Sequence, residues 1–276
     1  MLAALILVGG TATWARAQLQ GADPAQAALD GSRPAHLFSL DYGDLVLKDT
    51  ASVFTAPARW DSGDWIEAAA AVSAVGGTAV FDRSIQARVQ ADRTAGEDTF
   101  MRRWQEFGNY YAFGALAAFD AWGELGGDAQ ARNAAMDGIA ASIIAGGLIT
   151  PALKIVVGRE RPSTTLSTFR FRPVSSNASF PSGHATEAFA VATAIAENYH
   201  SLWVQCLAYG TAGLVGYARV EQNAHFASDV VAGSLIGWSV ARGVVHRNDA
   251  AADPRKLTWT PYATPNGFGV VFRKEF

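Results

Sequence analysis

The chain has 276 residues, of which 50% are hydrophobic and 17% charged, against about 25% charged in an average soluble domain. This composition excludes a disordered chain and fits either one domain with a large core or a protein that lies partly in lipid. The formal net charge is −3, and Lys and Arg are spread along the chain without a basic block, so we expect no nucleic-acid partner.

The N-terminus has the pattern of a targeting segment. Residues 2 to 8 are apolar, and small residues follow up to Ala15-Arg16-Ala17, which matches the small-x-small rule for signal-peptide cleavage. We therefore predict a signal peptide over residues 1 to 17; no Lys or Arg precedes the apolar stretch, so an ordinary apolar helix is the alternative. Residues 18 to 60 are rich in Asp, Pro and Ala and predict a loosely structured N-terminal arm.

Long apolar segments separated by polar loops follow the arm. Each is longer than the roughly 4 to 8 residues of a buried strand, so they predict helices and an all-α domain over residues 61 to 250. Their many Ala and Gly residues predict close helix packing in water or in lipid. Cys206, the only cysteine, lies in the fifth segment, and we expect it to be buried and in no intrachain disulfide. The six segments are residues 65 to 81, 104 to 123, 134 to 157, 184 to 199, 201 to 218 and 228 to 246. The glycines that we expect at helix contacts are Gly76, Gly77, Gly146, Gly147, Gly210, Gly213 and Gly216.

The last segment, residues 251 to 276, has a different pattern. Asn266-Gly267 is a strong two-residue turn signal, and apolar residues alternate with others after it. The sequence therefore predicts a short C-terminal β-hairpin.

Polar residues gather at the ends of the predicted helices. Lys154 and Arg161 are seven residues apart, which places them on one face if the third helix continues to Pro162. His225 and Asp229 are four apart at the start of the sixth helix, within hydrogen-bond reach. In an antiparallel bundle these ends meet on the same side as the start of the fourth helix and the end of the fifth, which carries Arg219.

The fourth helix begins with Ser182, Gly183 and His184. Free backbone N–H groups and the helix dipole favour an anion at such an end, and glycine lets the anion approach the backbone. Lys and Arg side chains would supply positive charge to further oxygens. The residues alone therefore predict a phosphate site that carries histidine, and we expect no metal, because the surrounding cations would repel a divalent ion.

These motifs resemble the type 2 phosphatidic acid phosphatase and vanadium haloperoxidase superfamily, with its signature K-x6-R-P, P-S-G-H and S-R-x5-H-x3-D. One position departs from the pattern, since Ala218 stands where the family most often has Ser. The resemblance implies a six-helix bundle of the acid phosphatase/vanadium haloperoxidase type. The matching residues are Lys154 with Arg161-Pro162, Pro181-Ser182-Gly183-His184, and Arg219 with His225 and Asp229.

The resemblance also implies residue roles. His225 would attack phosphorus and form a phosphohistidine, Asp229 would orient its imidazole, and His184 would act as general acid and then as base. No cofactor is implied, and vanadate would bind as a phosphate mimic. The phosphate-binding residues implied are Lys154, Arg161, Ser182, Gly183 and Arg219.

We expect a metal-independent phosphatase for phosphate monoesters. Its substrate is a phosphorylated lipid, such as phosphatidic acid or an isoprenoid diphosphate, or a small phosphomonoester. A vanadate-dependent haloperoxidase and a non-catalytic phosphate-binding membrane protein are the alternatives. The loop over residues 163 to 179, with Phe169 and Phe171, is our candidate for one wall of the site.

The sequence does not decide whether the helices lie in a membrane or in water. Residues 201 to 218 carry no charge, which favours a membrane span, whereas Glu67 and Asp120 lie inside their segments, where a charge in lipid is costly. A cleaved signal peptide, six spans and an outward-facing site cannot all hold. We therefore expect an exported protein, periplasmic or membrane-associated.

Overall fold

The computed structural model describes residues 33–34, 36–165, 167–252, 258–264 and 267–273. Pro34–Ala251 form one compact unit, and the strands near the C-terminus belong to a second. The predicted signal peptide and residues 18–32 of the predicted arm lie outside the described residues.

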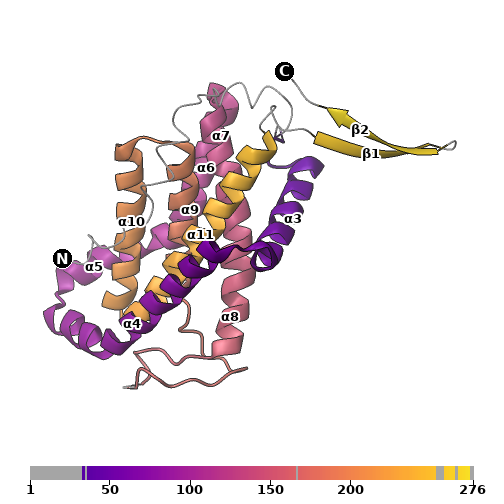
Figure 1. Ribbon diagram of the computed structural model, residues 1–276. Helices are drawn as coiled ribbons and strands as arrows, with labels where there is room; N and C mark the ends of the chain where they lie inside the picture. Colours follow the sequence, from indigo (N-terminus) through magenta and orange to yellow (C-terminus); the bar gives the residue numbers. More distant parts are fainter. Residues whose placement is uncertain (1–32, 35, 166, 253–257, 265–266, 274–276) are drawn as a thin grey trace. The chain divides into compact units, whose positions relative to one another are not determined.

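The regular secondary structure of the unit Pro34–Ala251 is helical (Figure 1). Helices cover nearly all of the six predicted segments, so the helical class is confirmed, but the count of six is not. The structure adds α3 and α5, breaks the second predicted helix at Asn109 and divides the third around a π-helix. The helices are α3 (Leu40–Thr55), η1 (Ala56–Arg59), α4 (Ser62–Asp92), α5 (Ala95–Trp104), η2 (Gln105–Gly108), α6 (Tyr110–Gly126), α7 (Ala129–Ala141), η3 (Ser142–Ile149), α8 (Thr150–Val157), α9 (Gly183–Asn198), α10 (Leu202–Glu221) and α11 (Ala227–Ala252).

Helix α3 occupies part of the segment for which we expected a loosely structured arm. It begins after Ser39, whose side chain accepts a hydrogen bond from the Tyr42 N–H as an N-cap. Tyr42 and Asp49 are buried, and the Tyr42 hydroxyl donates to the Met136 carbonyl at 2.7 Å. Contacts with α7 and α11 therefore order this segment, although its composition alone does not predict an ordered helix.

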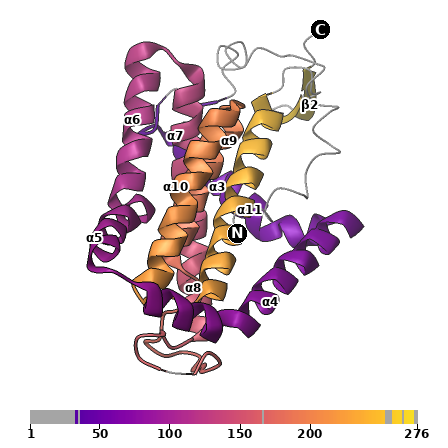
Figure 2. The ribbon, with the colours of Figure 1, turned by 90° about the vertical axis from the view of Figure 1, so that its left-hand side faces the viewer.

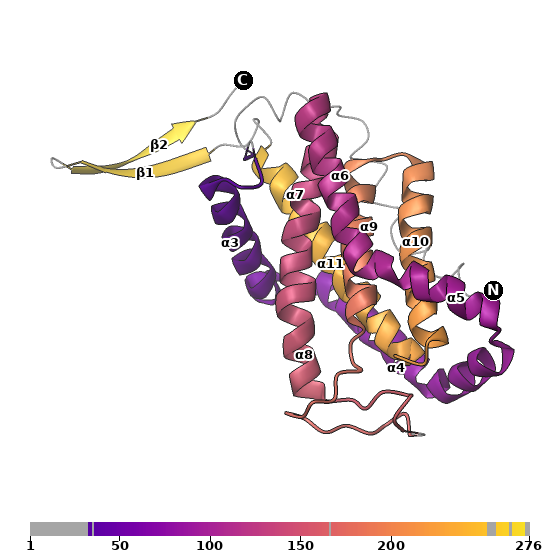
Figure 3. The ribbon, with the colours of Figure 1, turned by 180° about the vertical axis from the view of Figure 1, so that it is seen from behind.

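Four helix ends meet at one end of the bundle. In Figures 1 to 3 the C-termini of α8 and α10 and the N-termini of α9 and α11 lie at the lower end, above the loop over residues 158 to 182. Figure 3 shows α7 and α8 following one another along one line down to this loop. The antiparallel arrangement inferred from the sequence is therefore present, and it brings the predicted site residues to one end.

The third predicted helix ends earlier than Pro162. Helix α8 stops at Val157, and Gly158 takes the left-handed conformation with φ 57°. A Cβ at Gly158 would lie 1.8 Å from the Arg172 carbonyl oxygen, so only glycine fits here. Arg161 therefore lies in the loop, and the condition under which it would share a helical face with Lys154 is not met.

The close helix contacts form at other glycines than most of those we predicted. A Cβ added at Gly237 of α11 would lie 2.1 Å from the Thr186 carbonyl oxygen of α9, and buried alanines of α7, α9 and α11 pack beside it. Gly216 and Gly146 do face close neighbours, whereas nothing lies within 4 Å at the Cβ positions of Gly76, Gly77, Gly210 or Gly213. A glycine in the sequence does not reveal which face of its helix is packed.

Large apolar side chains cover much of the outer surface of this unit. Within the described residues, Ala129–Val157 is the one helical stretch long and apolar enough to cross a membrane, with a mean hydropathy of 1.9. Cys206 is exposed, contrary to our expectation, because the outward side of α10 is itself apolar. The exposed side chains include Trp65, Val72, Phe81, Tyr110, Phe113, Trp122, Ile155, Val156, Leu202, Trp203 and Leu207.

Strands β1 (Thr258–Thr264) and β2 (Gly267–Arg273) pair antiparallel, from Thr258 opposite Arg273 to Thr264 opposite Gly267. They lie in the segment for which the sequence predicts a hairpin.

Candidate active site

His225, the predicted nucleophile, lies in the turn between α10 and α11. The backbone N–H groups of Ala224 and His225 both donate to the Arg219 carbonyl at 3.1 Å, and Asn223 has φ 56°, a conformation that Asn tolerates well. This turn places His225 just before α11, beside Arg219. The His225 side chain is 2% exposed.

The imidazole of His225 is oriented by a backbone carbonyl. Its Nδ1 lies 2.7 Å from the Ser179 carbonyl oxygen, whereas the Asp229 carboxylate is 3.7 Å away, beyond hydrogen-bond distance. A carbonyl only accepts hydrogen bonds, so Nδ1 carries the proton and Nε2 keeps its lone pair. The sequence places Asp229 in the orienting role, but the direct contact comes from Ser179.

Asp229 is fully buried and accepts three short hydrogen bonds at this point. The Ser179 hydroxyl donates to Oδ2 at 2.6 Å, the Phe226 N–H donates to Oδ2 at 2.9 Å, and Arg159 donates to Oδ1 at 2.6 Å. Burial by itself raises the pKa of Asp229, but these partners and nearby His225 bring it below the ordinary value. Because His225 is beyond hydrogen-bond distance, we attribute this lowering of the pKa to Arg159 and Ser179.

Burial and neighbouring charge keep both histidines of the site neutral. Desolvation lowers the pKa of His225 to about 4, and its attraction to Asp229 only partly opposes this effect. Desolvation also lowers the pKa of His184 to about 4, with further lowering by the charges of Arg219, His225, Arg161 and Lys154. These four groups therefore lie close enough to His184 to change its pKa, so most of the predicted site residues are near one another.

The start of α9 is built as the sequence predicts. The Ser182 hydroxyl accepts a hydrogen bond from the Ala185 N–H at 3.4 Å as an N-cap, and the Ser182 N–H donates to the Asp229 carbonyl at 2.9 Å. Ser182 is buried, and Gly183 and His184 form the first turn with partial exposure. This contact ties the N-terminus of α9 to that of α11.

Two of the predicted cations contact the protein itself. The Lys154 ammonium donates to the carbonyl oxygens of Ala178 and Pro181, at 2.6 and 2.8 Å. Arg219 is 9% exposed and hydrogen-bonds the side-chain oxygen of Gln105. Its Nε is buried, and no acceptor for it exists among the described residues. An unpaired buried donor of this kind is costly, and an anion would satisfy it.

Sequence reasoning missed Arg159, Asp82, Ser179 and Gln105. Arg159 is 2% exposed and joins Asp229 to Asp82 of α4, 77 residues away. Asp82 lies outside the three motifs, so their spacing gives no sign of this contact. The fully buried Ser179 contacts His225 through its backbone carbonyl. Every residue has such a carbonyl, so the residue type gives no sign of this contact.

The fold and the site together define a class of protein: a helical bundle with a candidate oxyanion site at one end, where neutral histidines and cations surround a helix N-terminus. Residues 138–252, which include every predicted site residue, match the family model of the PAP2 superfamily. Over these residues the chain is similar to the PAP2 superfamily.

The curated relatives are lipid A 1-phosphatases. That of Porphyromonas gingivalis is 36% identical over 94 residues, 33% of this chain and 19% of the relative. That of Rhizobium etli is 34% identical over 115 residues, 38% of this chain and 47% of the relative. That of Rhizobium johnstonii is 33% identical over 104 residues, 35% of this chain and 41% of the relative. This chain thus spans less than half the length of the curated relatives that it matches.

Two solved structures are similar. The crystal structure of Aquifex aeolicus LpxE is 22% identical, with a TM-score of 0.48 over 59% of this chain and 93% of that chain. A transmembrane PAP2-type phosphatidylglycerolphosphate phosphatase from Bacillus subtilis is 20% identical, with a TM-score of 0.49 over 76% of this chain and 96% of that chain.

Proposed function

We propose that this protein is a metal-independent phosphatase that hydrolyses phosphate monoesters of lipids through a phosphohistidine intermediate. The observation that carries the proposal is the hydrogen bond between His225 Nδ1 and the Ser179 carbonyl, at 2.7 Å. It leaves Nε2 unprotonated as a nucleophile, beside Arg219 and the N-terminus of α9.

In the first step, the Nε2 lone pair of His225 attacks phosphorus in line, and the bond from phosphorus to the ester oxygen breaks. His184 donates a proton to that oxygen. His184 must be protonated for this step, and its pKa of about 4 in the empty site is too low. The negative charge of the substrate phosphate offsets the surrounding cations and raises the pKa of His184 when it binds.

In the second step, His184 takes a proton from water, and the resulting hydroxide attacks the phosphohistidine. The bond from phosphorus to Nε2 breaks, and inorganic phosphate leaves. In both steps the transition-state charge lies on the equatorial oxygens, so fixed donors and cations contribute most of the catalysis. We assign that role to Lys154, Arg161, Arg219, Ser182 and the Gly183 N–H.

Two observations support a lipid substrate. The curated relatives are lipid A 1-phosphatases, and large apolar side chains lie exposed along α4, α6, α8 and α10, as expected of helices that contact lipid. We propose a membrane-associated enzyme whose substrate carries its phosphate on a lipid, with lipid A 1-phosphate as the specific candidate.

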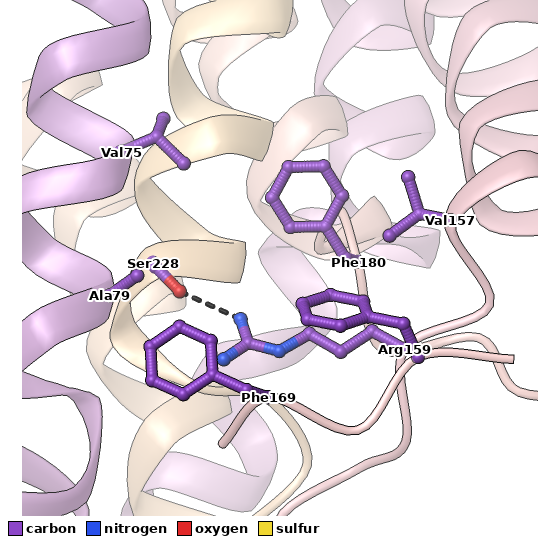
Figure 4. A pocket seen from close by; sticks show the side chains of 8 residues that line it. Val75, Ala79, Val157, Arg159, Phe169, Phe180 and Ser228 are labelled. Carbon is purple, nitrogen blue, oxygen red and sulfur yellow. Dashed lines mark hydrogen bonds between the residues drawn. The ribbon is translucent and has the colours of Figure 1, made fainter.

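Aromatic residues of the loop over residues 158 to 182 form an apolar pocket of about 200 Å³. Phe169, Phe180, Val75 and Val157 line it, and the Arg159 side chain extends among them toward Ser228 (Figure 4). The predicted wall residues Phe169 and Phe171 both line this pocket.

Replacing Phe169 and Phe171 with Ala tests this wall. We expect kcat/KM for a lipid phosphate to fall about 10-fold, as when apolar contact is removed from a bound substrate, with little change for p-nitrophenyl phosphate. Phe100→Ala, an exposed aromatic on α5, is the matched control. Equal losses on both substrates would refute a role of the wall in lipid selection.

The function is tested by hydrolysis in EDTA with p-nitrophenyl phosphate, short-chain phosphatidic acid and lipid A as substrates. We expect activity that vanadate blocks and that His225→Ala lowers by at least about 1,000-fold, as for other covalent nucleophiles. A 32P-labelled, acid-labile adduct should form on wild type and be lost in His225→Ala.

Other results would point to the alternatives. Bromide oxidation with vanadate and peroxide, without hydrolysis, would indicate a haloperoxidase. Phosphate binding without either reaction would indicate a non-catalytic protein.

A further inference from the structure

We propose that Arg159 and Asp82 are positioning residues that fix the His225 imidazole through Asp229 and Ser179, and thereby make α4 part of the active-site framework. The proposal rests on the proposed function for its effect on catalysis. It starts from a set of buried charges that the reaction steps above do not use.

Arg159 is held from three sides. Its guanidinium donates to Asp229 at 2.6 Å, to Asp82 at 2.8 Å and to the Ser228 hydroxyl at 2.7 Å. It also donates to the Thr168 carbonyl through Nε at 3.1 Å and through a second nitrogen at 2.6 Å. Arginine suits this position because its planar fork of donors serves several acceptors at once.

Asp82 closes the network from α4. It accepts hydrogen bonds from the Ser228 N–H at 2.9 Å and from the Ser228 hydroxyl at 2.5 Å, in addition to Arg159. Asp82 is fully buried, although most of α4 is exposed. Two buried carboxylates thus share one guanidinium, and the Phe226 ring lies 4.4 Å from its centre. Charges removed from water in this way hold their geometry tightly, because no water replaces a lost partner.

The network leads to the nucleophile through Ser179. Arg159 fixes one oxygen of Asp229, and the other oxygen accepts from the Ser179 hydroxyl. The Ser179 carbonyl then holds His225 Nδ1. Ser179 is fixed at a further point, since its N–H donates to the Arg159 carbonyl at 3.1 Å. A displacement of Arg159 therefore moves both groups that orient the imidazole.

Helix α4 also supports the turn that carries His225. Gln86 hydrogen-bonds Asn223, and Gln90 donates to the carbonyl oxygens of Val220 and Glu221, at 3.2 and 2.9 Å. The C-terminal half of α4 therefore contacts the site at several polar points along one side.

The main test is the double variant Asp82→Asn with Arg159→Met. It removes one negative and one positive charge, so the net charge of the cluster is unchanged, and neutral replacements of buried ion pairs often leave stability intact. We expect kcat to fall about 100-fold, the usual cost of a misplaced reacting group, while KM changes less than about threefold, because the predicted phosphate contacts remain.

The 15N NMR signals of the imidazole give a readout that needs no activity. Wild-type His225 should show one neutral tautomer, protonated on Nδ1, and the double variant should show a mixture of the two tautomers. The matched control is Asp49→Asn, which removes a buried carboxylate paired with Arg247. It lies near the other end of α11 and should leave kcat and the tautomer unchanged.

A folded double variant with wild-type kcat and a single Nδ1–H tautomer would overturn the proposal. If the double variant does not fold, Ser228→Ala removes the hydroxyl between Asp82 and Arg159 without removing a charge. We expect about a tenfold loss of kcat and a mixed tautomer in that variant, and unchanged values would overturn the proposal equally. If wild type hydrolyses no phosphate ester, the proposed function fails, and the tautomer still decides the positioning role.

Discussion

At the scale of single residues, the site works with histidines held neutral by burial. His225 has its Nδ1 proton directed at a backbone carbonyl and its pKa lowered to about 4, so its Nε2 stays unprotonated in mildly acidic solution, as the proposed nucleophile requires. His184 has an equally lowered pKa but a different task, because a general acid needs a proton. A bound anion resolves this conflict, since its negative charge opposes the cations around His184.

We therefore expect the pKa of His184 to rise by more than about one unit when inorganic phosphate or vanadate fills the site. The measurement is an NMR titration of the imidazole signals with and without the anion. His246, whose side chain is 52% exposed and lies near Glu197, is the internal control and should not respond. An unchanged His184 titration at saturating phosphate would contradict an anion site beside it.

The lowered pKa values of His184 and His225 also determine how the stability of the folded protein changes with pH. In the unfolded chain both histidines titrate near their ordinary pKa of about 6.5, whereas in the folded protein they titrate near 4. The unfolded state therefore binds protons first as the pH falls, and stability decreases from about pH 6.5 down to about pH 4. Above about pH 6.5 the two histidines add no pH dependence.

At the scale of elements, the arrangement depends on close contact between α9 and α11. Gly233 and Gly237 let α11 approach the backbone of α9, where a Cβ would lie 2.4 Å from the Ser182 carbonyl oxygen and 2.1 Å from that of Thr186. The Ser182 N–H in turn donates to the Asp229 carbonyl. This contact brings the histidine at the start of α9 next to the one before α11.

We expect Gly237→Ala to destabilise the protein by about 1–3 kcal/mol, the usual cost of overpacking a tight contact. Gly243→Ala in the same helix has nothing within 4 Å of the new Cβ and should be neutral or stabilising by up to about 1 kcal/mol. Denaturant unfolding in detergent measures both. Equal effects of the two variants would mean that α11 does not pack on α9 through Gly237.

At the scale of the whole molecule, the described helices expose large apolar side chains on their outer faces. Ile155 and Val156 of α8 and Leu202 and Trp203 of α10 are all exposed. Such a surface is costly in water and favourable in lipid. Some charges are instead buried and paired, as Asp49 is with Arg247 and Asn248.

We expect the protein to remain with the membrane fraction after washing with 1 M salt and with alkaline carbonate, because apolar contact with lipid does not depend on ionic strength. Immunoblotting of pellet and supernatant measures this, and a peripheral protein bound through charge serves as the control for extraction. Recovery in the supernatant would contradict the lipid-facing interpretation of the exposed residues.

The sequence by itself determined the helical class, and it predicted the residues of the candidate phosphate site. It could do so because helix periodicity and motif spacing are local, and the antiparallel order of the helices brings Lys154, His184 and His225 to the same end. Only the tertiary structure decided how these residues are held. Asp82 meets Arg159 across 77 residues of chain, the Ser179 backbone orients His225, and α3 is ordered by its partners in α7 and α11. Pairing of buried charges and close packing at particular glycines depend on which faces meet, and no local pattern specifies that.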